Sequence, residues 1–557
     1  MATGQEHGAG GPRPTANPIW EAYETARGNQ QRGRTWEDDR YVTRTWDDWR
    51  TQAERMAIGL RRRGVTRGTR VASVLTNTFD VCAGIIGTWL AGGTLISLPI
   101  PRRGQAPLDY LAQLQRICGS SGAHIVLLEP RFLALLGAES LGPPAVGFDA
   151  LAEDGTLEAT PPADDEVAFV QYSSGSTREP TGCMLTMGAL AQQERMIIER
   201  VGADENTVGF SWLPLSHDMG LFAGPLLAWT SGMSGTIGSP ERFLRQPGTW
   251  FDDCAALGAN LTMGPSFGLA LATRRARRRP PQDRIPLSAL VLGGERIEWD
   301  VLREADEVLG PYGVGLDTML PAYGLAEAAL AVTMKRLDGS TPRVRAVELE
   351  ALYRSELVPT TIGEEGSLAV VSCGPPVDGA AVRIEGDGPV GRICIRSASM
   401  TAGYLDDEAL TQRTIPDGEL VTNDLGFLDD GELHVIGRTD DVISVGGRNV
   451  SARDAELSIE RCDGVRPGCA ALIELPDASG ARLLIALELR GELSAGTAPL
   501  AREVADVAYR AVGLRAEECV VLAPGTMPKT PSGKIQRFRC RSLLQDDADA
   551  IVERVAL

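Results

Sequence analysis

A loop of small and hydroxyl-bearing residues is the stretch of this chain that most directly suggests chemistry. Ser173, Ser174, Gly175, Ser176 and Thr177 follow an apolar run, residues 167–170, which predicts a buried strand. Such a loop can turn several backbone N–H groups and hydroxyls toward one point, and that arrangement suits a polyphosphate. The Gly-Lys-Ser/Thr ending of a Walker loop is missing. The composition alone fits a solvated linker at least as well, so distant segments have to decide between the two.

Lysine is rare in this chain. It occurs only at positions 335, 529 and 534, and arginine supplies the rest of the 55 basic residues. Lys529 and Lys534 bracket one six-residue segment. Because a compact, flexible ammonium differs from a planar guanidinium, a lysine retained where arginine otherwise prevails indicates a chemical role. Chance placement of the three lysines is the alternative.

One histidine lies at a predicted strand end. His217 sits between a proline-kinked strand and an apolar helix expected over residues 221–229, where a pocket wall is plausible. A lone histidine is more often an ordinary surface or core residue. Asp218 beside it is expected to cap the helix.

Two further strand ends open into glycine turns. Residues 290–296 predict a strand that leads into Gly293-Gly294, and residues 321–327 predict a second turn with Glu327 at the mouth of an apolar helix. Nucleotides bind at the carboxyl edge of open α/β sheets. A carboxylate there can hold Mg²⁺ between ATP phosphates, although either turn alone is more often plain structure.

A basic run stands out against the acidic whole. Arg274, Arg275, Arg277, Arg278 and Arg279 precede two prolines, whereas the chain of 557 residues has a net charge of −19. A solvated helix end explains such a run, and a dock for an acidic partner is the sharper hypothesis. The overall charge argues against general binding of nucleic acid or anionic membranes.

Composition also bears on location and metal sites. Ten cysteines and four histidines are scattered without zinc-ligand spacing, so reduced thiols in a cytoplasm are expected. No secretion signal is visible in residues 1–18, which are Gly/Pro-rich and expected to be disordered. Residues 81–100 lack charge, but their glycines favour a helix over 80–90 and a strand over 94–98 rather than a membrane span.

The order of the expected elements predicts an α/β fold. Residues 19–165 alternate amphipathic helices with short strands, and a helix is expected over residues 185–201. Short strands with Gly and Asp turns over residues 366–430 predict a small β-subdomain. We therefore expect a large, multi-sheet N-terminal domain of layered α/β subdomains over residues 19–438, followed by a small, mobile α+β domain over residues 439–557.

Five separated motifs together resemble one superfamily. They occupy residues 173–182, 323–327, 422–426, 437–441 and 528–534, in the order found in the adenylate-forming enzymes, which include acyl-CoA synthetases, amino-acid adenylation domains and luciferases. The resemblance extends from about residue 19 to 545. It implies activation of a carboxylic acid by ATP with Mg²⁺.

Within that superfamily the chain most resembles the fatty acyl-AMP ligases. Residues 211–220 (Ser-Trp-Leu-Pro-Leu-Ser-His-Asp-Met-Gly), residues 239–247 and residues 323–329 are similar to their segments. Residues 335–361 look like the insertion that, in those ligases, restrains the C-terminal domain and accompanies loss of CoA use. The resemblance implies a fatty or related carboxylic acid as substrate and transfer of its acyl group to an acyl carrier protein, in polyketide, lipopeptide or related metabolism.

The resemblance also implies roles for single residues. Lys534 would contact the substrate carboxylate and the α-phosphate, and His217 would gate or line the acyl pocket. Glu327 would bind Mg²⁺ together with Thr177. Asp424 would accept hydrogen bonds from the ribose hydroxyls, and Arg438 would donate to ribose or phosphate. The loop Ser173, Ser174, Gly175, Ser176 and Thr177 would hold the β- and γ-phosphates, while Gly294, Glu295, Tyr323, Gly324 and Leu325 would line the adenylate site, with the Tyr323 ring against the base.

Three departures from the family pattern leave rival interpretations open. Arg178 and Thr181 replace a Gly and a Lys that are common in the loop, and Arg392 stands where a Glu is usual. An acyl-CoA synthetase is the nearest rival, and an inactive adenylate-binding relative is another. An amino-acid adenylation domain fits less well, because no Phe-Asp follows Met219-Gly220 to hold a substrate ammonium.

Overall fold

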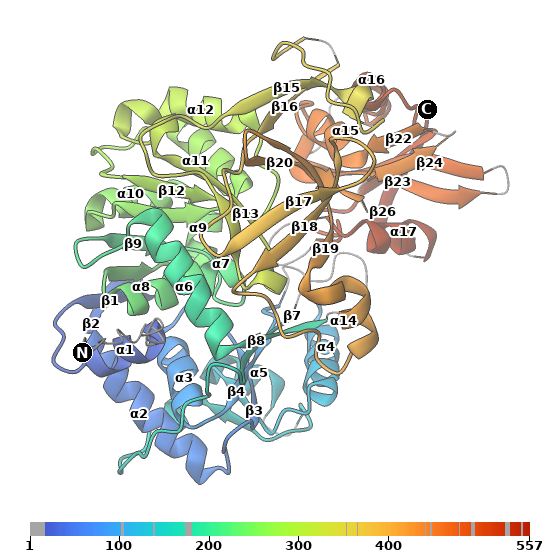
Figure 1. Cartoon of the computed structure of the whole chain (residues 1–557). Coiled ribbons are helices and arrows are strands. Elements are labelled where there is room, and N and C mark those ends of the chain that lie inside the picture. Colours follow the sequence, from blue (N-terminus) through green and yellow to red (C-terminus); the bar gives the residue numbers. More distant parts are fainter. Residues whose placement is uncertain are drawn as a thin grey trace, which may run out of the picture.

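A computed structural model describes most of the chain. The described residues are 17–101, 105–137, 140–172, 181–352, 354–364, 366–439, 442–445, 448–477, 480–491, 496–529, 535–546 and 550–557. Two sheets flanked by helices form the body of the molecule, a smaller antiparallel sheet lies against them, and the C-terminal residues form a separate lobe (Figure 1). The predicted mixed α/β class is confirmed.

The larger sheet has eight strands and is parallel except at its edges. Its order is β14-β13-β12-β11-β9-β10-β1-β2, with β14 and β2 antiparallel to their neighbours. Parallel strands of one sheet end at the same edge, so the residues after β9, β11, β12 and β13 are brought together. The strands are β1 Arg32–Glu37, β2 Arg40–Thr45, β9 Val208–Ser211, β10 Ser234–Ile237, β11 Leu261–Gly264, β12 Ala289–Leu292, β13 Met319–Gly324 and β14 Ala331–Met334.

The second sheet has six strands in the order β6-β5-β3-β4-β7-β8. Trp89 is fully buried against it and donates its indole N–H to the carbonyl of Ala168 at 2.8 Å. The glycine-interrupted stretch folds as predicted, into helix α3 Phe79–Leu90 and strand β4. The strands are β3 Arg70–Val74, β4 Thr94–Leu98, β5 Ile125–Leu128, β6 Ala145–Gly147, β7 Val167–Tyr172 and β8 Gly182–Thr186.

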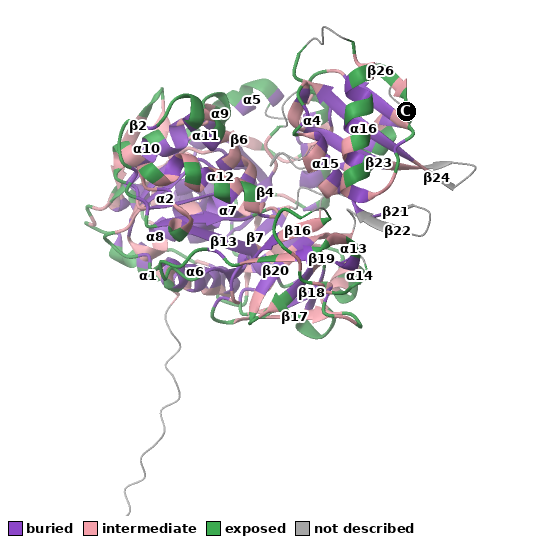
Figure 2. Cartoon of the chain, turned by 90° about the horizontal axis from the view of Figure 1, so that it is seen from above, coloured by how far each residue is buried: buried purple, intermediate pink, exposed green. Residues whose placement is uncertain are grey.

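Helices cover the sheets because their apolar stripes need burial. The interior is continuous from one sheet to the other, with buried residues under both layers (Figure 2). Within the described residues no helix is long and apolar enough to cross a membrane. The helices of this part are α1 Pro18–Thr25, α2 Trp46–Arg62, α4 Pro107–Ser120, α5 Pro130–Leu136, α6 Met187–Val201, α7 Asp218–Leu221, α8 Leu227–Ser231, α9 Pro240–Arg245, α10 Thr249–Leu257, α11 Ser266–Arg278 and α12 Trp299–Leu309.

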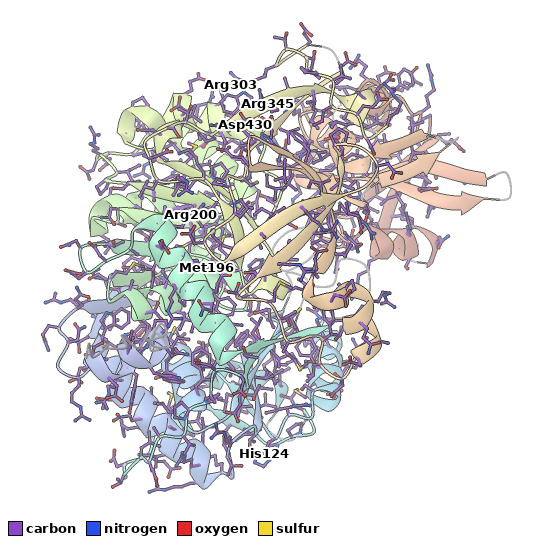
Figure 3. All side chains as sticks on the ribbon, in the orientation of Figure 1. His124, Met196, Arg200, Arg303, Arg345 and Asp430 are labelled. Carbon is purple, nitrogen blue, oxygen red and sulfur yellow. The ribbon has the colours of Figure 1, made fainter. Side chains whose placement is uncertain are left out.

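The short strands predicted after residue 366 are present as a four-stranded antiparallel sheet, β17-β18-β19-β20. The insertion at residues 335–361 contributes strand β15, which pairs with β16, and a short helix. Arg345 of β15, labelled in Figure 3, forms an ion pair with Asp429. The elements are β15 Val344–Glu348, α13 Leu349–Leu352, β16 Ser367–Val371, β17 Ala380–Glu385, β18 Gly391–Ser397, α14 Glu408–Thr414, β19 Leu420–Asp429 and β20 Glu432–Arg438.

The C-terminal lobe has a core of its own on each face of its sheet. Alternate residues of β23 point to opposite sides, so Leu472 packs with helices α15 and α16, whereas Ile473 packs with helix α17. The four-stranded sheet has the order β23-β24-β25-β26. The elements are β21 Val442–Val445, β22 Arg448–Ser451, α15 Ala452–Ile459, β23 Val465–Asp477, β24 Gly480–Leu489, α16 Ala498–Val512, β25 Glu518–Leu522, α17 Arg537–Asp546 and β26 Ile551–Ala556.

Arg296 ties this lobe to the large sheet. It follows β12 and lies 2.7 Å from the carboxylate of Asp454 on α15 and 2.9 Å from that of Glu298. A third bond runs from its Nη1 to the carbonyl of Ile436 at 3.0 Å. Only 11% of the Arg296 side chain and 10% of the Asp454 side chain are exposed. Burial lowers the pKa of the guanidinium, but the two carboxylates outweigh burial and raise it, so Arg296 stays charged.

Three predictions about helices are wrong. The helix expected from residue 185 begins at Met187, because residues 182–186 form β8 beside β7 and Thr186 caps the helix. Glu327 does not open an apolar helix: a single 3₁₀ turn, Ala326–Ala328, leads into β14. The helix expected over residues 221–229 is broken by a π-helical turn, Phe222–Leu226, around Pro225.

Removing the Arg296 charge should loosen the C-terminal lobe. Arg296→Met keeps an aliphatic stem but removes the cation shared by two largely buried carboxylates, and breaking a buried ion pair typically costs about 3–5 kcal/mol. We expect a lower midpoint of chemical unfolding and faster proteolysis of the lobe. Arg303→Met is the matched control, since Arg303 on α12 is 63% exposed and 3.7 Å from Asp300 (Figure 3). Equal midpoints for wild type and Arg296→Met would refute this role of Arg296.

Candidate active site

Glu327 lies where the large sheet meets the smaller antiparallel one. Its Oε1 accepts a hydrogen bond from the Tyr404 hydroxyl at 2.9 Å, and its carbonyl accepts one from the Thr401 N–H at 2.7 Å. Burial raises the pKa of the carboxyl, and the charges of Asp424 and Asp218 raise it further, although the Tyr404 bond opposes them. A desolvated carboxylate among other carboxylates is an environment in which a cation is favoured.

A second cluster joins β13 to the antiparallel sheet. The Tyr323 hydroxyl donates to Oδ2 of Asp424 at 2.7 Å, and Nε of Arg438 lies 3.4 Å from Oδ1 of the same carboxylate. Asp424 and Arg438 are direct partners on β19 and β20. Burial and the Asp424 charge raise the pKa of Tyr323 well above its ordinary value, so this phenol remains a hydrogen-bond donor.

The turn after β12 places Gly294 and Glu295 at the same edge. Gly294 has φ +79°, a left-handed conformation that glycine adopts without the strain of a side chain. Oε1 of Glu295 accepts the backbone N–H of Phe267 at 2.6 Å, one of the free N–H groups in the first turn of α11. The bond fixes this carboxylate against a helix start, where negative charge is favoured.

Gly324 and Leu325 form the tight turn that follows Tyr323. A Cβ on Gly324 would lie 1.7 Å from the carbonyl oxygen of Leu330, so no other residue fits there without moving the backbone. The same carbonyl accepts the Leu325 N–H at 2.9 Å. The turn therefore fixes the distance along the chain between Tyr323 and Glu327.

His217 lies beside the base of the predicted phosphate loop. Its Nδ1 is 2.6 Å from Oδ1 of Asp218, and its side chain is 33% exposed. The neighbouring Ser216 carbonyl accepts a hydrogen bond from Gln171, at the end of β7, at 3.1 Å. His217 itself is the N-cap residue of α7, so the predicted capping role of Asp218 is wrong; the Asp218 carboxylate accepts the N–H of Met219 at 2.7 Å instead.

Several predicted residues lie outside the described part of the chain. They are the loop residues Ser173 to Thr177, Arg178, Lys534, and Asp440, which the resemblance to the adenylate-forming enzymes implies is the hinge of the C-terminal domain. The other two lysines have structural partners. Lys335 bonds the carbonyl of Arg336 at 3.0 Å, and Lys529 lies 3.0 Å from the Cys469 sulfur. All ten cysteines are buried free thiols, as predicted.

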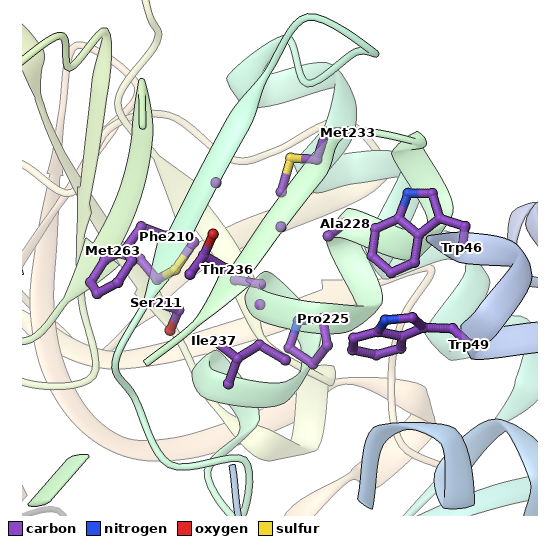
Figure 4. Close-up of a pocket in the computed structure, with 14 residues that line it drawn as sticks. Trp46, Trp49, Phe210, Ser211, Pro225, Ala228, Met233, Thr236, Ile237 and Met263 are labelled. Carbon is purple, nitrogen blue, oxygen red and sulfur yellow. The ribbon is translucent and has the colours of Figure 1, made fainter. Parts of the chain in front are cut away.

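An apolar pocket lies behind the kinked helix that follows His217 (Figure 4). Its walls come from the strands of the large sheet, from α2 and from the π-helical turn. Trp46 and Trp49 line one side, and Met233, Ile237 and Met263 line the other. His217 is not among its lining residues, so the predicted gating role is not supported at this pocket and stays a prediction.

Comparisons with known proteins identify the family of the chain. Residues 24–405 match the family described as AMP-binding enzyme. The chain belongs to this family. The medium-chain-fatty-acid–acyl-carrier-protein ligase JamA of Moorena producens is 33% identical over 402 residues, 68% of this chain and 67% of that protein. The long-chain-fatty-acid–AMP ligase FadD26 of Mycobacterium marinum is 28% identical over 543 residues, 91% of this chain and 92% of that protein.

A solved structure extends the comparison to the fold. It comes from a study of fatty acyl-adenylate ligases from E. coli and L. pneumophila, and it superposes with a TM-score of 0.87 at 25% identity. The superposition covers 95% of this chain and 97% of that one. The resemblance of this AMP-binding enzyme to fatty acyl-AMP ligases is therefore confirmed.

Sequence reasoning missed Tyr404 and Gln171. Tyr404 holds Glu327, and burial beside that carboxylate raises the pKa of its hydroxyl far above the ordinary value. The available signal in the sequence was weak: the tyrosine follows a glycine, Gly403. In the structure Gly403 has a φ of +126°, which marks a turn. Gln171 directly follows the strand predicted over residues 167–170, and nothing in its position foretold a contact with residue 216.

One departure from the family pattern has a simple structural account. Arg392, in place of the usual Glu, lies on β18 and pairs with Glu385 on the neighbouring strand. Both side chains are largely exposed, at 48% and 37%. Compared with the usual Glu, Arg392 is therefore an exposed side chain of opposite charge that has a partner on the neighbouring strand.

The buried charge of Glu327 should lower the stability of the protein without ligands. Because its folded pKa is raised, ionisation costs folding free energy above the unfolded pKa and none below it. Glu327→Gln keeps an acceptor for Tyr404 and removes the charge. We expect its Tm to equal or exceed that of the wild type at pH 7, and the difference to shrink toward pH 4.

Glu24→Gln is the control, since Glu24 is exposed on α1. Scanning calorimetry at several pH values, without ATP or Mg²⁺, measures the effect. A Tm difference between Glu327→Gln and wild type that grows on acidification has the wrong sign and would refute the argument.

Proposed function

We propose that this AMP-binding enzyme converts a fatty or related carboxylic acid and ATP into acyl-AMP and pyrophosphate, and passes the acyl group to the phosphopantetheine thiol of an acyl carrier protein. The observation that carries the proposal is the junction of Tyr323, Asp424, Arg438 and Glu327 at one sheet edge. The relatives named for fatty acids support the substrate class, and JamA supports the acceptor.

The described residues fit the nucleoside part of ATP. Asp424 presents a carboxylate held by Tyr323, and a carboxylate accepts hydrogen bonds from two neighbouring ribose hydroxyls. Arg438 beside it supplies donors for ribose or phosphate. Gly294, Glu295, Gly324 and Leu325 come from the two adjacent turns, and the Tyr323 ring offers a flat face to the base.

Glu327 fits Mg²⁺, with Thr177 as the second proposed ligand. A hard oxygen ligand on a desolvated carboxylate suits this cation, which would neutralise phosphate charge when it is bound. Glu327 would hold its position through the Tyr404 hydrogen bond. The carboxylate charge is available only when the proton is lost, so cation binding should weaken as the pH falls toward the raised pKa.

The chemical step needs two anions to meet. A carboxylate oxygen of the acid attacks the α-phosphorus of ATP, a new P–O bond forms, and the bond to pyrophosphate breaks. Lys534 would lie between the acid and the α-phosphate, and the loop Ser173 to Thr177 would hold the leaving pyrophosphate. Fixed donors of this kind stabilise charge as it develops in the transition state. The thiolate of the carrier then attacks the acyl carbon and AMP leaves.

The division into residues 19–438 and 439–557 belongs to the proposal too. The first half-reaction needs ATP and the acid, and the second needs the carrier thiol, so different substrates must reach one site. A C-terminal lobe that turns about Asp440 would admit them in succession. The separate core of the lobe supports this division. Metabolic roles in polyketide or lipopeptide synthesis and a cytoplasmic location are further parts of the proposal.

The proposal is tested by mass spectrometry of one reaction that contains Mg-ATP, pooled carboxylic acids of graded length, CoA and a holo-acyl carrier protein. Accumulated acyl-AMP and acylation of the carrier alone would support it and name the acid. Acyl-CoA as the main product would favour the rival interpretation, an acyl-CoA synthetase. One relative that is 27% identical over 557 residues is named as a fatty-acid–CoA ligase and supports this alternative. No acyl-AMP from any acid would favour an inactive relative.

Lys534→Ala should abolish most adenylation and leave ATP binding nearly intact. Removal of one positioned donor typically lowers the rate about 10²–10³-fold, whereas ATP keeps its many other contacts. Pyrophosphate release measures the rate, and calorimetric titration with ATP measures binding. Lys335→Ala is the control, because Lys335 bonds the carbonyl of Arg336. Pyrophosphate release by Lys534→Ala at the wild-type rate would overturn the assignment.

A further inference from the structure

A groove of about 340 Å³ lies between helix α11 of the large part and the C-terminal lobe. Three structural elements supply its walls: the last turns of α11, the end of α15 and the end of β24. We call it the arginine groove. It is lined by Arg274, Arg277, Arg278, Glu460, Arg461 and Arg490.

The arginine groove carries an excess of positive charge on an acidic protein. Arg277 lies 3.2 Å from Glu304, and Arg461 lies 2.9 Å from Asp300. The single carboxylate of the lining, Glu460, lies 3.4 Å from Arg453. Among the described residues, no ion pair is formed by Arg274, Arg278 or Arg490. The net charge of the chain is −19, so this concentration of cations is local.

Helix electrostatics explain only part of the arginine groove. Cations are favoured at the C-terminal end of a helix, which accounts for the arginines in the last turn of α11. The same argument does not apply to Arg490, which follows a strand. Unpaired guanidiniums that face a common space repel one another, and an anion in that space relieves the repulsion.

We propose that the arginine groove is the docking surface for the acidic face of a carrier protein that bears phosphopantetheine. This inference rests on the proposed function and places the acceptor on the enzyme. Guanidinium groups bind carboxylates in pairs of hydrogen bonds, and charges at an interface rim speed association. The groove spans both parts of the enzyme, so a carrier bound there contacts the lobe and the body together.

The charge distribution favours a small acidic domain over an extended polyanion. Nucleic acid or an anionic membrane would extend beyond the groove and meet the acidic remainder of the surface. A compact partner contacts only the groove, because charges further apart than about 8 Å are largely screened at physiological salt. The size of the space, about 340 Å³, leaves room for several side chains of a partner.

The test reverses two groove charges that have no ion-pair partner among the described residues. Arg274→Glu combined with Arg278→Glu should raise KM for the holo-acyl carrier protein about tenfold or more and leave kcat nearly unchanged. The carrier is the one that the wild-type enzyme acylates in the mass-spectrometric experiment. The variant should also lose most of the salt dependence of carrier acylation. Acyl-AMP formation, measured by trapping with hydroxylamine, should match the wild type.

The control reverses two exposed arginines that do not line the arginine groove. Arg27→Glu combined with Arg32→Glu changes the net charge equally, near the N-terminal helix α1 (Figure 1). It should leave KM for the carrier close to the wild-type value. An equal rise in KM for both double variants would mean that only net charge matters, and the docking surface would be rejected.

Other outcomes separate this inference from the proposed function. Wild-type KM and salt dependence in the groove variant would overturn the docking surface and leave the proposed function standing. A rise in KM for CoA, with carrier acylation unchanged, would assign the groove to the phosphates of CoA instead. Loss of acyl-AMP formation would show that the groove acts on adenylation. If wild type acylates no carrier at all, the acceptor part of the proposed function fails and the docking surface with it.

Discussion

The buried guanidinium of Arg296 connects the parts of the protein that the candidate site needs. It follows the turn with Gly294 and Glu295, bonds the carbonyl of Ile436 two residues before Arg438, and pairs with Asp454 of the C-terminal lobe. One side chain therefore fixes the turn after β12, the end of β20 and the lobe relative to one another. A buried ion pair of this kind adds little net stability compared with apolar packing, but it tolerates few alternative arrangements.

Tyr323 and Tyr404 show the same dependence on distant contacts. Each hydroxyl donates to a carboxylate on another sheet or turn, at separations of 101 and 77 residues along the chain. Hydrogen bonds to charged acceptors are stronger than neutral ones, so they hold the carboxylates in fixed directions. Glu327 and Asp424 are thereby held at one edge, although the charges of Asp424 and Asp218 disfavour ionisation of Glu327.

The sequence predicted the elements better than their ends and their contacts. Periodicity and glycine turns placed α3 and β4 nearly to the residue, because local apolar spacing determines them. The helix expected from residue 185 failed because pairing with β7 converts residues 182–186 to strand, which local spacing does not report. Glu327 and Asp424 were identified through motifs, whereas Tyr404 and Arg296 matter only through contacts that appear after folding.

The raised pKa of Glu327 sets the energetic character of the site. Ionisation of a carboxylate with a raised pKa destabilises the folded protein, and a cation that binds beside the carboxylate offsets this cost. Ligand binding and fold stability are therefore coupled at this position, and stabilisation by ligand grows with the logarithm of its concentration above Kd. An uncharged residue at position 327 would give a more stable protein without ligands and would remove the charge that we propose binds Mg²⁺. Under the role proposed for Glu327, the buried charge lowers stability without ligands and serves cation binding, as is expected where function requires a desolvated charge.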